Sequence, residues 1–355
     1  MSAVAAVMLG VLVAWAPATV KRWAEQEPVV GEFVEADAQG VHLRLQSDTI
    51  ATLIPWYDVE RVELENGTLA RYDRFARQAW RAHARAQRGD YQGALPLYES
   101  MRDEYLWKPG PQSMDVSIGL KRCLINQGDR AQAIEPALAW FVSSRMLASV
   151  DASGVSSVDA QTMLHTDLPP IRSSSAPTAP LDLDVQAGIT ERERLLYACF
   201  RLVDAPAESR ESIVAEIETH RRSMPARDAG VVLFEQMAYA QAHPDRSKRN
   251  AARDALRRRC QTQHDTWIEV WARLAIGAAL LNEPDRLRKD LGVVELLHVI
   301  VRLHAIDPNL TMLAAELAAG HLESTGRAQW ATQILHDAQR HIASPLASQE
   351  YQSND

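Results

Sequence analysis

The chain has 355 residues, of which 46% are hydrophobic and 24% charged, so it is long enough for two or three domains with a sizeable core. Its formal net charge of −8 argues against a protein built mainly to hold polyanions, although not against a local basic patch. The three cysteines form no Cys-x-x-Cys pair and the eleven histidines form no His-Glu-x-x-His motif, so we expect no metal and no cofactor. We expect Cys123, Cys199 and Cys260 to be buried free thiols.

The N-terminus begins with an apolar run, residues 3–20, interrupted only by Thr19. Within it, Ala16-Pro17-Ala18 has the small-x-small form that signal peptidase reads, so residues 1–18 are predicted to be a cleaved signal peptide of an exported, periplasmic or cell-envelope protein. One alternative is a retained membrane anchor, because eighteen apolar residues just span a bilayer, and this is the only membrane contact we expect. The other alternative is a buried helix of a cytosolic protein.

Residues 27–66 carry strand signals. Apolar and polar residues alternate in V-H-L-R-L (Val41–Leu45), and a further strand is predicted over Thr49–Ile54. The segment I-P-W-Y-D-V-E-R-V (Ile54–Val62) resembles the closing element of small SH3-like or Sm-like barrels of exported bacterial proteins. That resemblance implies a small β-barrel-like module. Its acidic surface has the wrong sign for RNA.

A helix, a tight turn and a second helix are predicted over Ala82–Met101. Ala82 and Ala94 permit a close helix approach, Gly89 can take the left-handed conformation that ends a helix, and Asp90 can cap the next one. One such hairpin cannot bury its apolar face alone, so it requires stacked neighbours.

This pattern of small residue, Gly-Asp turn and small residue resembles the tetratricopeptide repeat. Looser matches occur at Gly119–Trp140, with G-D-R-A-Q-A-I, and at Ala319–Ala338, with G-R-A-Q-W-A-T-Q-I-L. The resemblance implies a mainly α fold, an α-solenoid of antiparallel hairpins over residues 72–148 and 189–343. The Ala94–Ala133 spacing exceeds the family's period of roughly 34 residues, so an irregular helical bundle is the alternative.

Residues 149–188 interrupt the helices. They are rich in Ser, Asp and Pro, which predicts either a mobile linker or an ordered arm lying along the repeats. The arm alternative has apolar anchors at Met163, Leu164, Leu168 and Ile171. Residues 344–355 are predicted to be a flexible tail.

No nucleophile elbow or phosphate loop is present, so the leading hypothesis is a non-enzymatic scaffold of the cell envelope that binds a protein or peptide. Repeat geometry places its partner-binding residues on the concave face of the first helices, with one tryptophan beside a Pro-Gly break: Arg85, Lys121, Arg122, Asn126 and Trp107.

The helix over residues 246–259 is strongly basic. It is interpreted either as a solvated face or as a docking face for an acidic partner, with Lys248, Arg249, Arg253 and Arg257. Two other functions stay open. One is a cytosolic nucleic-acid-associated protein that uses the Sm-like module and this helix, which export of the chain would argue against. The other is an envelope enzyme with an unrecognised site.

Overall fold

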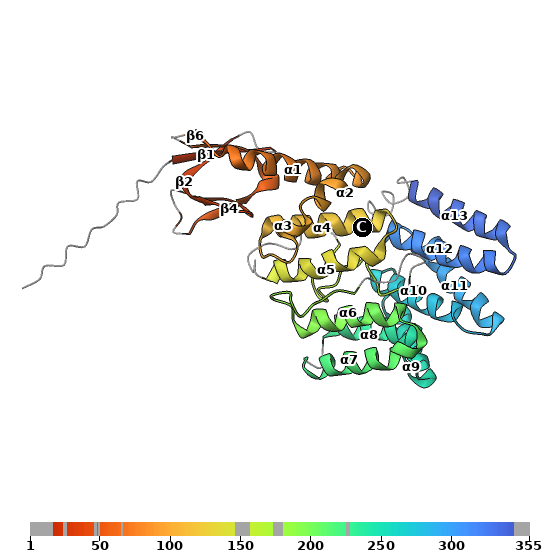
Figure 1. The fold of residues 1–355 in the computed structure, drawn as a ribbon. Coiled ribbons are helices and arrows are strands. Elements are labelled where there is room, and N and C mark those ends of the chain that lie inside the picture. Colours follow the sequence, from red (N-terminus) through yellow and green to blue (C-terminus); the bar gives the residue numbers. More distant parts are fainter. Residues whose placement is uncertain are drawn as a thin grey trace, which may run out of the picture. The chain divides into compact units, whose positions relative to one another are not determined.

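The computed structural model describes residues 17–23, 27–45, 48, 50–64, 67–145, 157–172, 180–224 and 228–343. The chain divides into two compact units, residues 1–119 and 120–355, and the boundary falls inside helix α4 (Pro111–Asn126). The first unit contains an antiparallel sheet and helices, and the second is mainly helical, as Figure 1 shows.

The sheet of the first unit is open. Its strand order is β4-β3-β2-β1-β5-β6, every pairing is antiparallel, and among the described residues the end strands β4 and β6 do not pair with each other. The strands are β1 (Pro17–Arg22), β2 (Val29–Ala36), β3 (Gly40–Arg44), β4 (Thr52–Pro55), β5 (Val59–Leu64) and β6 (Gly67–Thr68).

The predicted SH3-like or Sm-like barrel is therefore wrong in its closure, although the β-module itself is confirmed. The physical reason is that a helix, not a second half-barrel, covers the sheet: α1 (Ala70–Gln87) packs against β5 and the short 3₁₀ turn Trp56–Asp58. Two aromatic stacks fix this contact, Trp23 on Trp80 at 4.0 Å and Trp56 on Tyr72 at 4.7 Å between ring centroids.

Strand β1 lies between β2 and β5 and contains the last two residues of the predicted signal peptide. Pro17 pairs with Glu32, and Ala18, which is 1% exposed, pairs with both neighbouring strands. A cut after Ala18 would remove part of a central strand, so the predicted cleavage position conflicts with this sheet. The rest of the predicted signal, residues 1–16, lies outside the described residues.

The predicted hairpin over Ala82–Met101 is formed by α1 and α2 (Tyr91–Glu99), which precede the short helix α3 (Arg102–Tyr105). Gly89 has φ 77°, and the side chain of Asp90 caps α2 by accepting the Gly93 N–H at 3.0 Å. Just after this glycine, the Asp90 N–H donates to the Arg85 carbonyl at 2.9 Å, which closes the turn in the Schellman manner.

The same turn closes two further hairpins. The equivalent glycines, Gly128 and Gly326, have φ values of 81° and 76°. The next N–H donates back by five residues in both, Asp129 to Leu124 at 2.9 Å and Arg327 to Leu322 at 2.8 Å. Gly128 joins α4 to α5 (Arg130–Arg145), and Gly326 joins α12 (Pro308–Ser324) to α13 (Ala328–Ala343).

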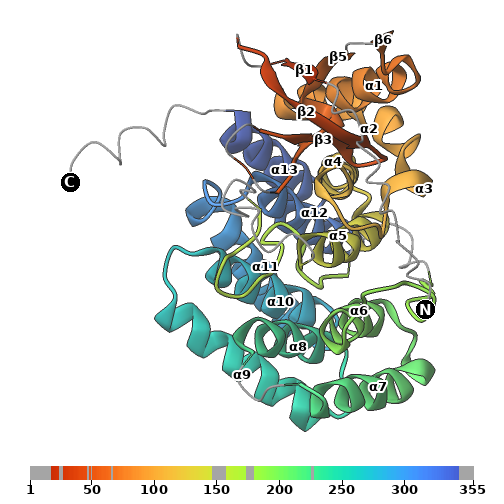
Figure 2. The same ribbon diagram turned by 90° about the vertical axis from the view of Figure 1, so that its left-hand side faces the viewer.

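Four successive hairpins make up most of the second unit, α6/α7, α8/α9, α10/α11 and α12/α13, and Figure 2 shows them in order. The first helices pack in sequence, α6 on α8 and α8 on α10. The remaining bounds are α6 (Glu191–Asp204), α7 (Arg210–Arg222), α8 (Ala229–Ala242), α9 (Arg246–Thr262), α10 (Trp267–Leu281) and α11 (Arg286–Arg302). The three cysteines are buried thiols that form no disulfide, as expected. Within the described ranges, no helix has the length and apolar character needed to cross a bilayer.

Candidate peptide-binding face and cleft

Residues 157–172, here called the arm, have no helix or strand of their own beyond an isolated bridge between Val158 and His165. Leu164, Leu168 and Ile171 are nonetheless buried, whereas Met163 is exposed with φ 50°. This part of the predicted linker-or-arm segment is therefore packed into the helical unit, and three of its four expected anchors are seated. The predicted tail, residues 344–355, lies outside the described residues.

A buried ion pair holds the arm to α4. The fully buried Lys121 Nζ donates to both carboxylate oxygens of Asp167, at 2.7 and 2.6 Å, and to Ser157 Oγ at 3.0 Å. Burial lowers the pKa of the Lys121 ammonium, although the Asp167 charge and hydrogen bond act in the opposite direction. An ammonium placed here stabilises the fold only while its carboxylate stays in place.

His165 completes this cluster as a neutral imidazole. Burial, and then the nearby Lys121 charge, lower its pKa well below the ordinary value. Its Nε2–H donates to the Ala137 carbonyl at 3.2 Å, which leaves Nδ1 as the acceptor for Lys121 Nζ at 3.3 Å. The ring packs edge-on against Trp140, with centroids 5.0 Å apart.

Four side chains of the helices bind the main chain of the arm and not its side chains. Arg192 of α6 donates to the Thr162 carbonyl at 2.6 Å, and Trp271 of α10 donates to the Thr166 carbonyl at 2.7 Å. The other two bonds run from Arg130 Nη1 to the Asp167 carbonyl at 2.9 Å and from Gln241 Nε2 to the Pro170 carbonyl at 2.8 Å. We call these four donors the arm-binding face. Three of them belong to first helices of hairpins.

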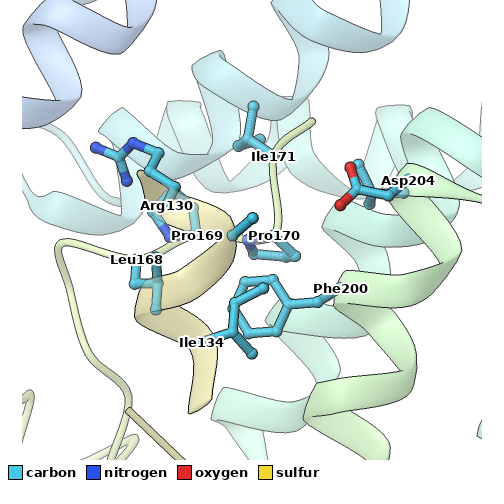
Figure 3. Close-up of a pocket in the computed structure, with 10 residues that line it drawn as sticks. Arg130, Ile134, Leu168, Pro169, Pro170, Ile171, Phe200 and Asp204 are labelled. Atoms are coloured by element: carbon cyan, nitrogen blue, oxygen red, sulfur yellow. The ribbon is translucent and has the colours of Figure 1, made fainter. Parts of the chain in front are cut away.

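The main chain of the arm crosses close to α8 at Gly230. A Cβ built on Gly230 would lie 2.6 Å from the Thr162 carbonyl oxygen, so only glycine fits at this crossing. Further along, Pro169 and Pro170 lie beside Ile134 of α5 and Phe200 of α6, as Figure 3 shows, and the cavity left there is only about 20 Å³. The seat of the arm is therefore filled.

A larger opening begins where the arm ends. A cleft of about 330 Å³ lies between α10, α11 and α12 and starts beside Arg172. Apolar side chains of α10 and α12 line part of it, together with six polar or charged residues: Arg172, Asn282, Lys289, Glu316, His321 and Ser324. Burial and the Arg327 charge lower the pKa of His321, so the cations of the open cleft at neutral pH are Arg172 and Lys289.

The five predicted partner-binding residues are divided between the two units. Arg85 and Trp107 lie in the first unit, where Arg85 donates to the Gly93 carbonyl at 3.1 Å and Trp107 has φ 69°. In the second unit, Arg122 is half-buried and Asn126 is exposed and bonds within its own helix. Lys121 requires a correction, because it is completely buried and its ligand is the protein's own arm.

The basic helix is also less uniform than its sequence indicates. Arg253 does not belong to a docking face: it is 2% exposed and its guanidinium lies 2.6 Å from the Glu283 carboxylate. Arg249 donates to the His243 carbonyl at the end of α8. Lys248 and Arg257 are exposed, and Arg257 pairs with Asp254 on the same helix.

Sequence reasoning missed the residues that carry the site. Arg192, Gln241 and Lys289 are single polar residues in amphipathic helices, and Trp271 reads as core. The one local signal is Gly230, a glycine near the start of an otherwise apolar helix. Among the described residues, no group of three His, Cys, Asp or Glu side chains is placed to hold a metal ion.

Comparisons with protein-family models, with curated proteins and with solved structures found no match to this chain.

Proposed function

We propose that the protein is a non-enzymatic interaction scaffold that binds an extended segment of a partner protein in the open cleft of its second unit. One observation carries the proposal: helices of this unit, α10 of the cleft among them, already hold a non-helical segment, the arm, through donors aimed at its main-chain carbonyls. Because every peptide has such carbonyls, this chemistry suits peptides of varied sequence.

The cleft has no occupant among the described residues. Its volume of about 330 Å³ is within the range of ligand sites, and its apolar floor is bordered by Lys289, Asn282 and Ser324 as polar groups. Gly320 lies on the cleft wall with no heavy atom within 4 Å of the position of a Cβ. This wall therefore leaves room for a ligand chain.

Two finer parts of the proposal rest on the sequence. The recurrence of the Gly turn at Gly89, Gly128 and Gly326 supports a solenoid resembling tetratricopeptide repeats. The envelope location rests on the apolar residues near the N-terminus and is tested by finding the protein in a fractionated cell.

The binding proposal is tested by selecting random linear peptides on the immobilised full-length protein and on two variants. Gly320→Trp fills the cleft, and Gln339→Trp places the same side chain on the exposed face of α13 as a matched control. We expect selected peptides to bind the parent and Gln339→Trp but not Gly320→Trp. If Gly320→Trp retains the same peptides, the cleft is not the binding site.

A further inference from the structure

Arg172, the last described residue of the arm, has other cations on two sides. Arg172 and Lys289 line the cleft, whereas Arg210 of α7 and Arg249 of α9 lie beyond it. Within the part of the chain that the structure describes, none of the four forms an ion pair with a carboxylate. A cation without a carboxylate partner favours an anion beside it.

The local geometry explains how the cluster forms. Arg210 Nε donates to the Ala205 carbonyl at the end of α6, and Arg249 Nη1 donates to the His243 carbonyl at the end of α8. The Pro170 carbonyl of the arm accepts a hydrogen bond from Gln241, two residues before His243 at the end of α8. Arg172 follows Pro170 by two residues and therefore lies near these helix ends. The pKa of Arg210 is lowered by burial and then by the charges of Arg172 and Arg249.

The contacts of the arm show what such cations bind. There the carboxylate of Asp167 is held by Lys121, and Arg130 donates to the main chain of the same residue. The cleft also contains a lysine and an arginine, Lys289 and Arg172. Among the described residues, no carboxylate forms an ion pair with either of them. Its one acidic lining residue, Glu316, is exposed, and its charge acts on Arg130.

We infer that the segment bound in the cleft is acidic, with at least one Asp or Glu side chain held by Lys289 and Arg172. This inference rests on the proposed function and adds the chemistry of the partner. A net charge of −8 makes the remainder of this protein repel acidic segments, so a local basic cluster gives both steering and specificity.

The test is fluorescence anisotropy with a labelled peptide of alternating Asp and Leu, and with the same peptide carrying Asn in place of Asp. The cleft variant is Arg172→Met/Lys289→Met, and the matched control is Arg222→Met/Arg340→Met, which removes two exposed cations elsewhere. We expect the cleft variant, and the Asn peptide, to bind at least about tenfold more weakly, whereas the control stays within about twofold.

Three results would overturn the inference. Equal affinity for the Asp and Asn peptides would remove the acidic preference, and it would leave the proposed function standing if Gly320→Trp still abolishes binding. An equal loss in the cleft variant and the control would show only general attraction to positive charge. Displacement of the Asp peptide by inorganic phosphate at comparable concentration would identify a site for small anions.

Discussion

Removal of the buried ammonium by Lys121→Met tests whether the arm is an integral part of the second unit. The substitution keeps the length and apolar stem of the side chain and deletes the charge that contacts Asp167. At an effective dielectric of about 20, two charges about 3 Å apart attract by about 5 kcal/mol. Desolvation of each ion costs several kcal/mol, so the intact pair is close to neutral overall.

The single variant leaves the Asp167 carboxylate buried without its cation, and we expect the free energy of unfolding to fall by about 3–5 kcal/mol. The double variant Lys121→Met/Asp167→Asn leaves no net charge buried at this pair. Its loss of unfolding free energy should therefore be smaller, by about 2 kcal/mol or more, than the summed losses of Lys121→Met and Asp167→Asn. The assay is urea unfolding followed by circular dichroism. A loss below about 1 kcal/mol for Lys121→Met, or additivity of the two substitutions, would refute this reasoning.

Three further predictions use the same unfolding measurement. Gly128→Ala should lower the free energy of unfolding by about 1–2 kcal/mol, because the φ of Gly128 is 81°. Gly320→Ala should raise it by up to about 1 kcal/mol, because Gly320 lies within an exposed helix and also has space for a Cβ. A change of the same sign in both variants would contradict the turn assignment. Arg253→Met should lower the free energy of unfolding by about 3–5 kcal/mol, because the Arg253–Glu283 ion pair is buried. Arg257→Met should lower it by less than about 0.5 kcal/mol, because the Arg257–Asp254 pair is exposed. Similar losses in the two variants would contradict this difference. His165 has a depressed pKa in the folded state, so the unfolded chain takes up the proton first and stability should fall as pH drops below about 6.5, by up to about 1.4 kcal/mol per pH unit for this group. The slope should decrease in His165→Gln, and an unchanged slope would assign the effect to other groups.

The helical hairpins could be predicted because their signals are local. The turn at Gly89 needs a left-handed residue followed by a cap, and Asp90 supplies that cap within the same few residues. The strand over Gly40–Arg44 was likewise readable from alternation. The strand order was not readable, because β1 pairs with the distant strand β5 as well as with the neighbouring β2, and the apolar residues of β1 also fit a signal peptide.

The site could not be predicted because its contacts join residues far apart in the chain. Lys121 and Asp167 are separated by 46 positions, and Arg130 and Asn309, whose carbonyl accepts from Arg130, by 179 positions. In sequence the arm has the composition of a linker, and its anchors, Leu164 and Leu168, do not indicate which helices they contact. Only the packed helices turn these isolated residues into a binding face.

The most direct test of the proposed peptide cleft is amide hydrogen exchange of the full-length protein, with and without the Asp–Leu peptide. The account predicts new protection in α10, α11 and α12 around the cleft, and unchanged protection of the arm, whose seat is already filled. New protection that maps elsewhere, or loss of protection in the arm as the peptide replaces it, would contradict binding in the open cleft.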